Sequence, residues 1–510
     1  MPPTASPLAD YIARATASGS DLNTGFVAFL ASLEHIRSVS PEVAAAVVAE
    51  LDDQSNSLKM IASENYSSLA VQLAMANLFT DKYAEGYPYH RFYAGCDNVD
   101  AVEGRAVELA KDLFGAEHAY VQPHSGADAN LVAYWAILAA RVQSPFMESV
   151  GQTDPSKLSD DEWAELRHAL GNQRMLGMNY YSGGHLSHGY RLNASATMFD
   201  VQSYDVDRET NLLDYDAIRD HARAFRPLIL LAGYSAYSRR IDFSVFREIA
   251  DEVGAVLMVD MAHFAGLVAG KVDGFTGPYD PVAHAHVVTT TTHKTLRGPR
   301  GGMVLSTDEF GEYVDKGCPM VLGGPMPHVM AAKAVAFTEA AAPEFKDYAR
   351  AIVDNASALA AACIDNDMDI LTGGTDNHLM LANTDPYGLT GRQAESAVRE
   401  ANVTLNRNSI PFDPNGAWYT SGLRFGTPAL TSRGMGPSEM TEIASIMASV
   451  LSATTPRTIT RGKLAGQLSK ARATTDAETV ETARARVADL LSTYPLYPDL
   501  DLDYLKRSFA

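Results

Sequence analysis

Short apolar runs alternate with amphipathic, helix-like stretches over residues 81–340. The clearest runs, rich in β-branched or other apolar residues, are 227–232, 256–260 and 287–292. Runs of this length bounded by turn residues predict buried strands. Strands that alternate with helices form a mainly parallel sheet covered by helices, so we expect a large α/β domain here.

Two further units flank the large domain. Residues 26–80 read as helices, so we assign an N-terminal helical segment to residues 1–80. Residues 341–455 begin with a helix and predict a smaller α+β domain. Its expected elements are a helix from about residue 344, strands near 369–371 and 378–382, and a helix over 437–451.

Two more segments lie outside this simple division. The stretch at about 141–173 is polar and contains an acidic run, so it is expected to be a short helical insertion on the surface. Residues 456–510 form a C-terminal extension, with a helix expected over 476–491. The Pro, Tyr and Leu residues that follow this helix predict a tail docked on the body of the protein.

Composition narrows the class of protein. The chain has 510 residues, too many for one ordinary core, and 46% of them are hydrophobic while 20% are charged. Its net charge of −21 argues against a function built on the phosphate backbone, so nucleic acid is not an expected partner. Cys96, Cys318 and Cys363 have no paired spacing and predict neither a disulfide framework nor a zinc site. Residues 1–25 show no export signal, and the apolar run at 26–33 is shorter than the ~20 residues that cross a bilayer. We therefore expect a cytoplasmic protein without a membrane partner.

The stretch around Lys294 carries the strongest chemical signal. Four threonines at 289–292 end an apolar run, and His293, Lys294 and a Gly-rich loop follow. A lysine at the end of a buried strand is unusual, because an unpaired ammonium is costly to desolvate. A desolvated lysine is partly neutral, and its amine can form a Schiff base with a carbonyl such as that of pyridoxal phosphate. The alternative is a strand followed by a solvated lysine.

Asp260 ends another apolar run, at 255–259. Ligands of open α/β sheets bind at the carboxyl ends of the strands. A pyridoxal enzyme needs a carboxylate against the pyridinium nitrogen, since a protonated ring is a strong electron sink. Asp260 could instead cap the segment that follows. Together with Lys294, the cofactor role is favoured.

A series of motifs, taken in order, resembles the serine hydroxymethyltransferases across roughly residues 55–450. The motifs are residues 58–65, 81–88, 121–126, 183–186, 259–263, the loop around Lys294, and 420–424. The chain looks like a longer variant, with the extra segment near 141–173 and the C-terminal extension. The resemblance implies an aspartate-aminotransferase-like fold, fold type I of the pyridoxal phosphate enzymes, with the cofactor between a large and a small domain.

The resemblance also implies a transferase of one-carbon metabolism. It would reversibly move the hydroxymethyl group of L-serine to tetrahydrofolate, giving glycine and 5,10-methylenetetrahydrofolate, with pyridoxal 5'-phosphate covalently attached to Lys294. A folate-independent aldolase of β-hydroxy amino acids is the nearest alternative, since it shares every cofactor residue. A non-catalytic scaffold that binds RNA is a further alternative, against which the intact Lys294, Asp260 and Arg424 argue.

A phosphate site is expected just before a helix predicted over 130–140. A helix N-terminus offers free N–H groups and the positive end of a dipole, although Ser-Gly pairs precede many helices. By resemblance, the phosphate pocket contains Ser125, Gly126, Ala127 and His293, with Tyr83 and Gly323 from the neighbouring subunit. Ala127 and Asp128 stand where relatives often have serine and glutamine, so one hydroxyl contact is missing and a carboxylate is expected near the anion.

His185 lies in a Gly-Gly-His-Leu-Ser-His run. It could be an ordinary loop histidine, or it could bind a metal with His188. No carboxylate or cysteine is close in sequence, and no metal site is predicted. The resemblance implies that His185 stacks on the cofactor ring and can exchange protons. It also implies that Ser235 and His263 bond to the phenolate and imine region of the cofactor.

Arg424 lies between Gly422 and Gly426, in a stretch that can approach a small ligand closely. The planar fork of arginine binds a carboxylate bidentately. A surface arginine is the alternative. The resemblance implies that Arg424 holds the α-carboxylate of the amino acid, which decides the Cα bond that breaks, and that Ser63 belongs to the same substrate site.

Glu85 matches the family glutamate that handles protons between the serine hydroxyl and folate; a solvated loop carboxylate is the alternative. Tyr93 would approach the substrate from across a dimer, beside Phe92 where many relatives carry tyrosine. The folate pocket is expected to include Tyr180, Gly184, Leu186, Asn408, Gly416, Ala417 and Trp418. Because Tyr83, Tyr93 and Gly323 would serve the neighbouring site, a homodimer with shared active sites is the smallest competent unit.

Overall fold

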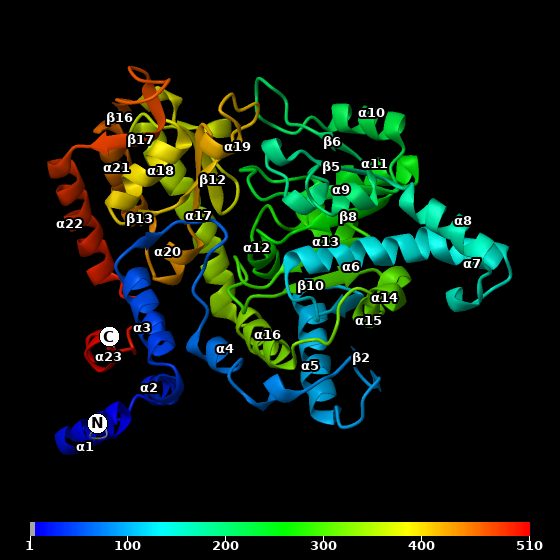
Figure 1. Cartoon of the computed structure of the whole chain (residues 1–510), viewed down its shortest axis with the longest axis horizontal. Helices are drawn as coiled ribbons and strands as arrows, with labels where there is room; N and C mark the ends of the chain where they lie inside the picture. Colours follow the sequence, from blue (N-terminus) through cyan, green and yellow to red (C-terminus); the bar gives the residue numbers. More distant parts are fainter. Residues whose placement is uncertain (1–5, 510) are drawn as a thin grey trace.

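The computed structural model describes residues 6–509, and its core is a seven-stranded sheet (Figure 1). The strand order is β4-β10-β9-β8-β7-β5-β6. β10 runs antiparallel to both of its neighbours, and the other pairs are parallel. The strands are β4 (His118–Tyr120), β5 (Arg174–Met178), β6 (Asp200–Tyr204), β7 (Ile229–Gly233), β8 (Val256–Asp260), β9 (Val287–Thr291) and β10 (Gly302–Ser306). The prediction of a mainly parallel sheet is therefore confirmed.

Helices cover both faces of this sheet. On β7, Ile229 and Leu231 belong to one buried cluster, whereas Leu230 and Ala232 belong to another, because successive side chains of a strand point to opposite faces. The first face is covered by α6 (Gly126–Leu138) and α14 (Asp308–Asp315). The second face is covered by α5 (Asp97–Phe114), α10 (Tyr215–Phe225), α11 (Phe243–Val253) and α16 (Pro327–Ala340). Burial on both faces explains why these strands read as unbroken apolar runs.

A second, antiparallel sheet has the order β11-β12-β15-β14. Its strands are β11 (Asp369–Ile370), β12 (Leu379–Asn383), β14 (Asn406–Asn408) and β15 (Gly422–Gly426), and the helices α17 (Pro343–Asp365), α18 (Gly391–Glu400) and α21 (Pro437–Ser452) pack with it. α17 contributes Phe345 and Ala349 to the large-sheet cluster and Ala356 and Leu359 to this one. The helix α17 therefore contributes to both hydrophobic cores. Because the two cores share a helix, the predicted domain boundaries stay a prediction.

The helical prediction for residues 26–80 is only partly right. The helices α2 (Thr24–Val39), α3 (Pro41–Ser55) and α4 (Leu69–Leu73) are present. Between them, β1 (Leu58–Lys59) is a strand that pairs in parallel with β13 (Val403–Thr404). Local apolar spacing could not indicate this strand, because its partner lies far along the chain.

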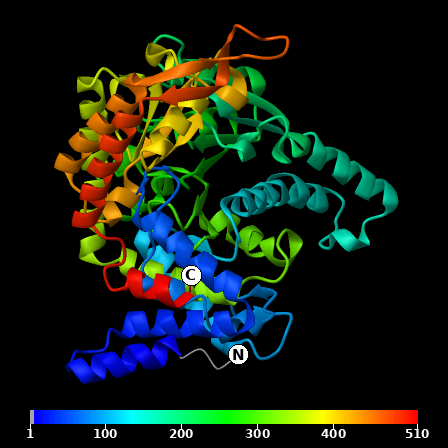
Figure 2. The same cartoon turned by 60° about the vertical axis from the view of Figure 1, so that its left-hand side comes forward.

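Two segments extend the body of the molecule. α7 (Ser144–Ser149) and α8 (Asp160–Gly171) project away from the large sheet, as expected of a surface insertion (Figure 1). α22 (Ala477–Thr493) lies beside α21, and α23 (Leu502–Phe509) lies against the N-terminal helices (Figure 2). Leu505 and Phe509 of α23 share a buried cluster with Phe26, Leu30 and Val48. The tail is therefore docked, as its composition predicts.

Candidate active site

One cavity of about 790 Å³ lies where the second sheet meets the carboxyl ends of β8 and β9. This volume suits a cofactor or substrate of small-molecule size, and the place is where ligands bind in open α/β sheets. The predicted site residues that line it are Ser63, Ser125, Gly126, Ala127, Tyr180, Gly184, His185, Leu186, Ser235, Asp260, His263, His293, Lys294, Asn408, Ala417 and Arg424. Residues predicted from distant motifs are therefore brought together around one space.

Lys294 lies in the turn after β9, which ends at Thr291, and is 9% exposed. The alternative of a solvated lysine is therefore wrong. Its carbonyl oxygen accepts a hydrogen bond of 2.8 Å from Nδ2 of Asn65, which fixes the backbone at this turn. Burial lowers the pKa of Lys294 to about 8, although the carboxylate of Asp260 opposes this effect. About a tenth of the amine is then neutral at pH 7, far more than for an unperturbed lysine, and the neutral amine is the nucleophile.

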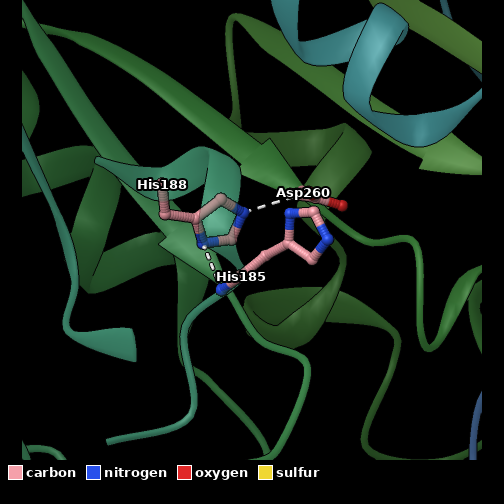
Figure 3. Close-up of side chains that lie close together, drawn as sticks. All are labelled: His185, His188 and Asp260. Atoms are coloured by element: carbon pink, nitrogen blue, oxygen red, sulfur yellow. Dashed lines mark hydrogen bonds and ion pairs between the residues drawn. The ribbon is translucent and has the colours of Figure 1, made fainter. Parts of the chain in front are cut away.

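Asp260 is buried at the end of β8 and accepts three hydrogen bonds, of which Figure 3 shows the one from His188. Its Oδ2 accepts from Nε2 of His188 and from Nδ2 of Asn130, each at 3.0 Å, and its Oδ1 accepts from the backbone N–H of Ala262 at 3.0 Å. Burial alone would raise the pKa of Asp260, but the hydrogen bonds that it accepts, above all the one from His188, outweigh burial and lower the pKa. The helix that follows, α12 (Ala265–Ala269), has Phe264 at its N-cap, so Asp260 is not its cap. The carboxylate is held ionised in the cavity wall.

His188 is fixed in one tautomer by its neighbours. Its Nδ1 accepts a hydrogen bond of 3.2 Å from the backbone N–H of His185. The proton of the neutral ring must then sit on Nε2, from which it is donated to Asp260. His188 thus secures the charge of Asp260 without itself lining the cavity.

His185 lines the cavity beside this pair (Figure 3). Burial lowers the pKa of His185 to about 4, so its ring is neutral near neutral pH. The potential metal-ligand atoms of His185, His188 and Asp260 lie within 4.8 Å of one another. The fold therefore brings a carboxylate to the two histidines, although none is close to them in sequence. His188 and Asp260 nevertheless hydrogen-bond directly, and the absence of a bound metal stays a prediction.

The start of α6 contributes an anion cradle to the wall of the cavity. Ser125 caps the helix by accepting a hydrogen bond of 3.2 Å from the N–H of Asp128, and α6 begins at Gly126, four residues before its predicted start at 130. A Cβ on Gly126 would lie 2.7 Å from Cγ2 of Thr291, so the backbone approaches the strand as closely as glycine allows. Burial lowers the pKa of His293 to about 3 and keeps this ring neutral. Free N–H groups in a helix N-terminus suit a phosphate.

Ala127 and Asp128, the two residues that depart from the family pattern, differ in whether they line the cavity. Ala127 lines the cavity, so the missing hydroxyl is a loss at the site itself. Asp128 does not belong to the lining, and its backbone N–H is taken by Ser125. The expectation of a carboxylate beside the anion is therefore not supported by the lining of the cavity.

Arg424 reaches the cavity from β15 and is held by two hydrogen bonds. Its Nη1 donates to the carbonyl of Ser235 at 2.8 Å, and its Nε donates to Oδ1 of Asn406 at 3.1 Å. Burial lowers the pKa of Arg424 to about 10, so the guanidinium remains charged at neutral pH. The alternative of a surface arginine is wrong, and a fixed cation faces the space next to Lys294.

Replacing Arg424 by lysine is expected to raise the KM for serine and for glycine by roughly 10- to 100-fold, since each hydrogen bond to a charged group is worth roughly 1.5–3 kcal/mol. The charge remains but the bidentate fork is lost, and cofactor absorbance should be retained. Steady-state kinetics measure the change. Arg350→Lys, on the exposed side of α17, is the matched control. Unchanged KM values in Arg424→Lys would show that the carboxylate binds elsewhere.

Tyr83, Glu85 and Tyr93 form a separate cluster that does not line the cavity of their own chain. The hydroxyls of Tyr83 and Tyr93 donate to the two carboxylate oxygens of Glu85 at 3.2 and 3.1 Å, and their rings pack edge to face. Gly324, next to Gly323, lies against the Tyr83 ring. The predicted roles of Tyr83, Tyr93 and Gly323 thus share one location, and Glu85 joins them there.

Only some of the residues predicted for the folate pocket line the cavity. Tyr180, Gly184, Leu186, Asn408 and Ala417 line the cavity, whereas Gly416 and Trp418, the sequence neighbours of Ala417, do not. Trp418 is 64% exposed, and the guanidinium groups of Arg392 and Arg407 lie over its ring at 5.3 and 6.0 Å.

The sequence does not single out several other residues of the cavity, although Glu64, Ala262 and Thr420 lie within its motifs. The cavity is also lined by Glu64, Ala236, Ala262, Thr291, Arg300, Glu395, Asn406, Arg407, Ser409 and Thr420. Behind it, Nδ1 of His263 lies 3.2 Å from Nε2 of His378, and both rings are buried. Burial lowers the pKa of His378 to about 3, so the two neutral rings share one hydrogen bond. His378 is 115 positions from His263 and lies in none of the quoted motifs, so the sequence gives no signal for this pair.

The residues present fit pyridoxal phosphate. A nucleophilic lysine, an ionised aspartate and a helix N-terminus surround one cavity, with a neutral imidazole in its wall. These are the groups that this cofactor needs at its aldehyde, its ring nitrogen, its phosphate and its ring face.

Comparison with known proteins identifies the family. The family profile described as serine hydroxymethyltransferase matches residues 36–147 and 168–447, and omits most of the projecting α7–α8 segment. A serine hydroxymethyltransferase of Treponema pallidum (strain Nichols) is 60% identical over 496 residues, which cover 97% of this chain and 85% of that protein. Another of Mycolicibacterium smegmatis is 58% identical over 487 residues, covering 95% and 97%, and one of Chlamydia trachomatis serovar L2 is 48% identical over 502 residues, covering 98% and 99%. These names do not favour the aldolase alternative. The chain belongs to the serine hydroxymethyltransferase family.

Proposed function

We propose that this protein transfers the hydroxymethyl group of L-serine to tetrahydrofolate, giving glycine and 5,10-methylenetetrahydrofolate, with pyridoxal 5'-phosphate held on Lys294. The observation that carries the proposal is the meeting of Lys294, Asp260 and Arg424 around one cavity. The direct test is serine-dependent formation of methylenetetrahydrofolate by the purified protein supplied with the cofactor. Serine cleavage that is indifferent to tetrahydrofolate would instead support the aldolase.

Each residue has a distinct task in this proposal. When bound, pyridoxal 5'-phosphate supplies a protonated ring that withdraws electrons from the substrate Cα. Asp260, kept ionised by His188, would stabilise the proton on the ring nitrogen. Arg424 would hold the α-carboxylate and so orient the Cα–Cβ bond, and the neutral ring of His185 would support the cofactor ring. Ser125, Gly126, Ala127 and His293 would hold the phosphate, and Ser235 and His263 would bond to the phenolate and imine region.

Glu85 is assigned the movement of the serine hydroxyl proton. It lies with Tyr83 and Tyr93 outside the cavity of its own chain, so we propose that this cluster acts on the cavity of a second copy. Gly323 would join it. The product is then made in a homodimer with two shared sites, and the folate lies along Tyr180, Gly184, Leu186, Asn408 and Ala417.

The surface around this cluster supports such a dimer. Large apolar side chains on neighbouring elements are strongly exposed; they include Leu78 at 84%, Tyr89 at 77%, Phe92 at 68% and Met320 at 61%. Several large apolar side chains exposed on neighbouring elements favour a surface that another protein covers. None of the helices in residues 6–509 has the length and hydrophobicity to cross a membrane. We retain the cytoplasm as the expected location.

Mixing two inactive variants tests the shared site. Lys294→Ala removes the nucleophile of one cavity, and Glu85→Gln removes the proton carrier that serves the other. Subunit exchange between them should restore roughly a quarter of wild-type transfer activity, since half of the dimers are mixed and each contains one intact site. Mixing Lys294→Ala with Asp260→Asn is the matched control, because both defects lie in the cavity of their own chain, and no activity should return. If the first mixture stays inactive although exchange is complete, Glu85 serves its own subunit.

A further inference from the structure

Lys333 is a buried cation that the proposed chemistry does not use. It lies on α16 and is 1% exposed. Its Nζ donates to three main-chain carbonyl oxygens: those of Val121 at 2.5 Å, Pro123 at 3.1 Å and Gly302 at 2.8 Å. Burying a lysine is costly, so a complete set of acceptors at this place indicates a specific task.

The three acceptors belong to two segments that lead to the anion cradle. Val121 and Pro123 follow β4 and precede Ser125, the cap of α6. Gly302 begins β10, and its backbone N–H donates to the carbonyl of Pro123 at 2.8 Å. The ammonium therefore joins the segment before α6 to the segment after Lys294.

The packing around these segments leaves no space for a side chain at Gly301 or Gly302. A Cβ on Gly302 would lie 2.1 Å from the carbonyl oxygen of Ser125, and a Cβ on Gly301 would lie 2.6 Å from Cε of Lys333. The N–H of Gly301 also donates to Nδ1 of His293, at 3.4 Å. A displacement of either segment would thus move Ser125 and His293 apart.

Three acceptors match the three N–H groups of an ammonium, whereas a neutral amine has only two. Burial lowers the pKa of Lys333 to about 7, and the carboxylate of Glu103 opposes this effect. Glu103 itself pairs with Arg91. Lys333 does not belong to the lining of the cavity, so any effect on a ligand acts through the backbone that it holds.

We propose that Lys333 is a positioning residue for the phosphate of the cofactor: it joins the two segments that carry Ser125 and His293, so that both face one anion. This inference rests on the proposed function, because it assumes that the anion is the cofactor phosphate. A lysine that merely stabilised the core would support every ligand of the cavity equally. A positioning lysine supports only ligands that carry the phosphate.

The test compares pyridoxal phosphate with pyridoxal, which lacks the phosphate, by absorbance titration of the cofactor-free protein. In Lys333→Met, the Kd for pyridoxal phosphate should rise by about 10- to 100-fold, the range found when outer partners of buried metal ligands are removed. The Kd for pyridoxal should not change. Lys346→Met, an exposed position on α17, is the control and should leave both values as in the wild type.

A second variant keeps the test decisive if Lys333→Met does not fold. Lys333→Gln retains an amide donor of shorter reach, and its ratio of the two Kd values should lie between those of the wild type and of the methionine variant. Equal weakening of both ligands, or no weakening of either, would overturn the proposal. Failure of the wild type to bind pyridoxal phosphate would instead contradict the proposed function.

Discussion

Replacing Lys294 by arginine is expected to lower serine-to-folate transfer by a factor on the order of 10³ or more, as for other residues that react covalently. The guanidinium stays protonated at any pH that the protein tolerates, so it cannot act as the amine nucleophile. The lysine itself is suited to this role because burial lowers its pKa to about 8. The rate of methylenetetrahydrofolate formation measures the loss. Lys316→Arg, at an exposed position beside Glu312, should leave the rate unchanged.

The same assignment has a chemical readout in the wild type. Reduction of the cofactor-loaded protein with borohydride, followed by peptide mapping, should place the pyridoxyl label on Lys294. In Lys294→Arg the label should be lost. A label on another lysine, such as the buried Lys333, would contradict the assignment whatever the activity of the variant.

Replacing Glu85 by glutamine is expected to reduce methylenetetrahydrofolate formation by about 10²- to 10⁴-fold, the usual contribution of a positioned acid or base. An amide oxygen can still accept from Tyr83 or Tyr93, so the cluster should keep its shape. Folate-independent cleavage of a β-phenyl hydroxy amino acid should survive. It releases a stable aldehyde by retro-aldol chemistry and needs only the groups in the cavity. Product assays with the two substrates measure the difference.

The control for this prediction is a residue of the cavity. Asp260→Asn should lower both activities, because the ring nitrogen loses its carboxylate. If Glu85→Gln also loses both activities in parallel while dimer and cofactor remain, Glu85 is a general part of the site. The division of labour between cluster and cavity would then be wrong.

The parts of the fold that the sequence predicts are those with local causes. β7, β8 and β9 are buried on both faces, so each appears as a continuous apolar run. Lys294 and Asp260 are recognisable because each lies at or just after the carboxyl end of such a strand, where burying a charged side chain is costly. The predicted start of α6 at residue 130 is too late, because Gly126 and Ala127 have loop-like residue types and become helical only with the cap that Ser125 forms.

What could not be predicted depends on contacts between distant segments. β1 is two residues long and exists only because β13 pairs with it. The bond from His188 to Asp260 spans 72 positions, and the longest bond of Lys333 along the chain spans 212. Such contacts follow from the order of strands in the sheet, which apolar spacing along the chain does not reveal.

The docking of α23 on the N-terminal helices sets the order in which the protein can be completed. Phe26, Leu30 and Leu33 leave the ribosome long before Leu505 and Phe509, which share their buried cluster. Until α23 has been made, the early helices present an uncovered apolar surface to chaperones and to other nascent chains. A truncated chain that lacks α23 would therefore keep every residue that lines the cavity but expose the apolar residues of its N-terminal helices, which favours aggregation.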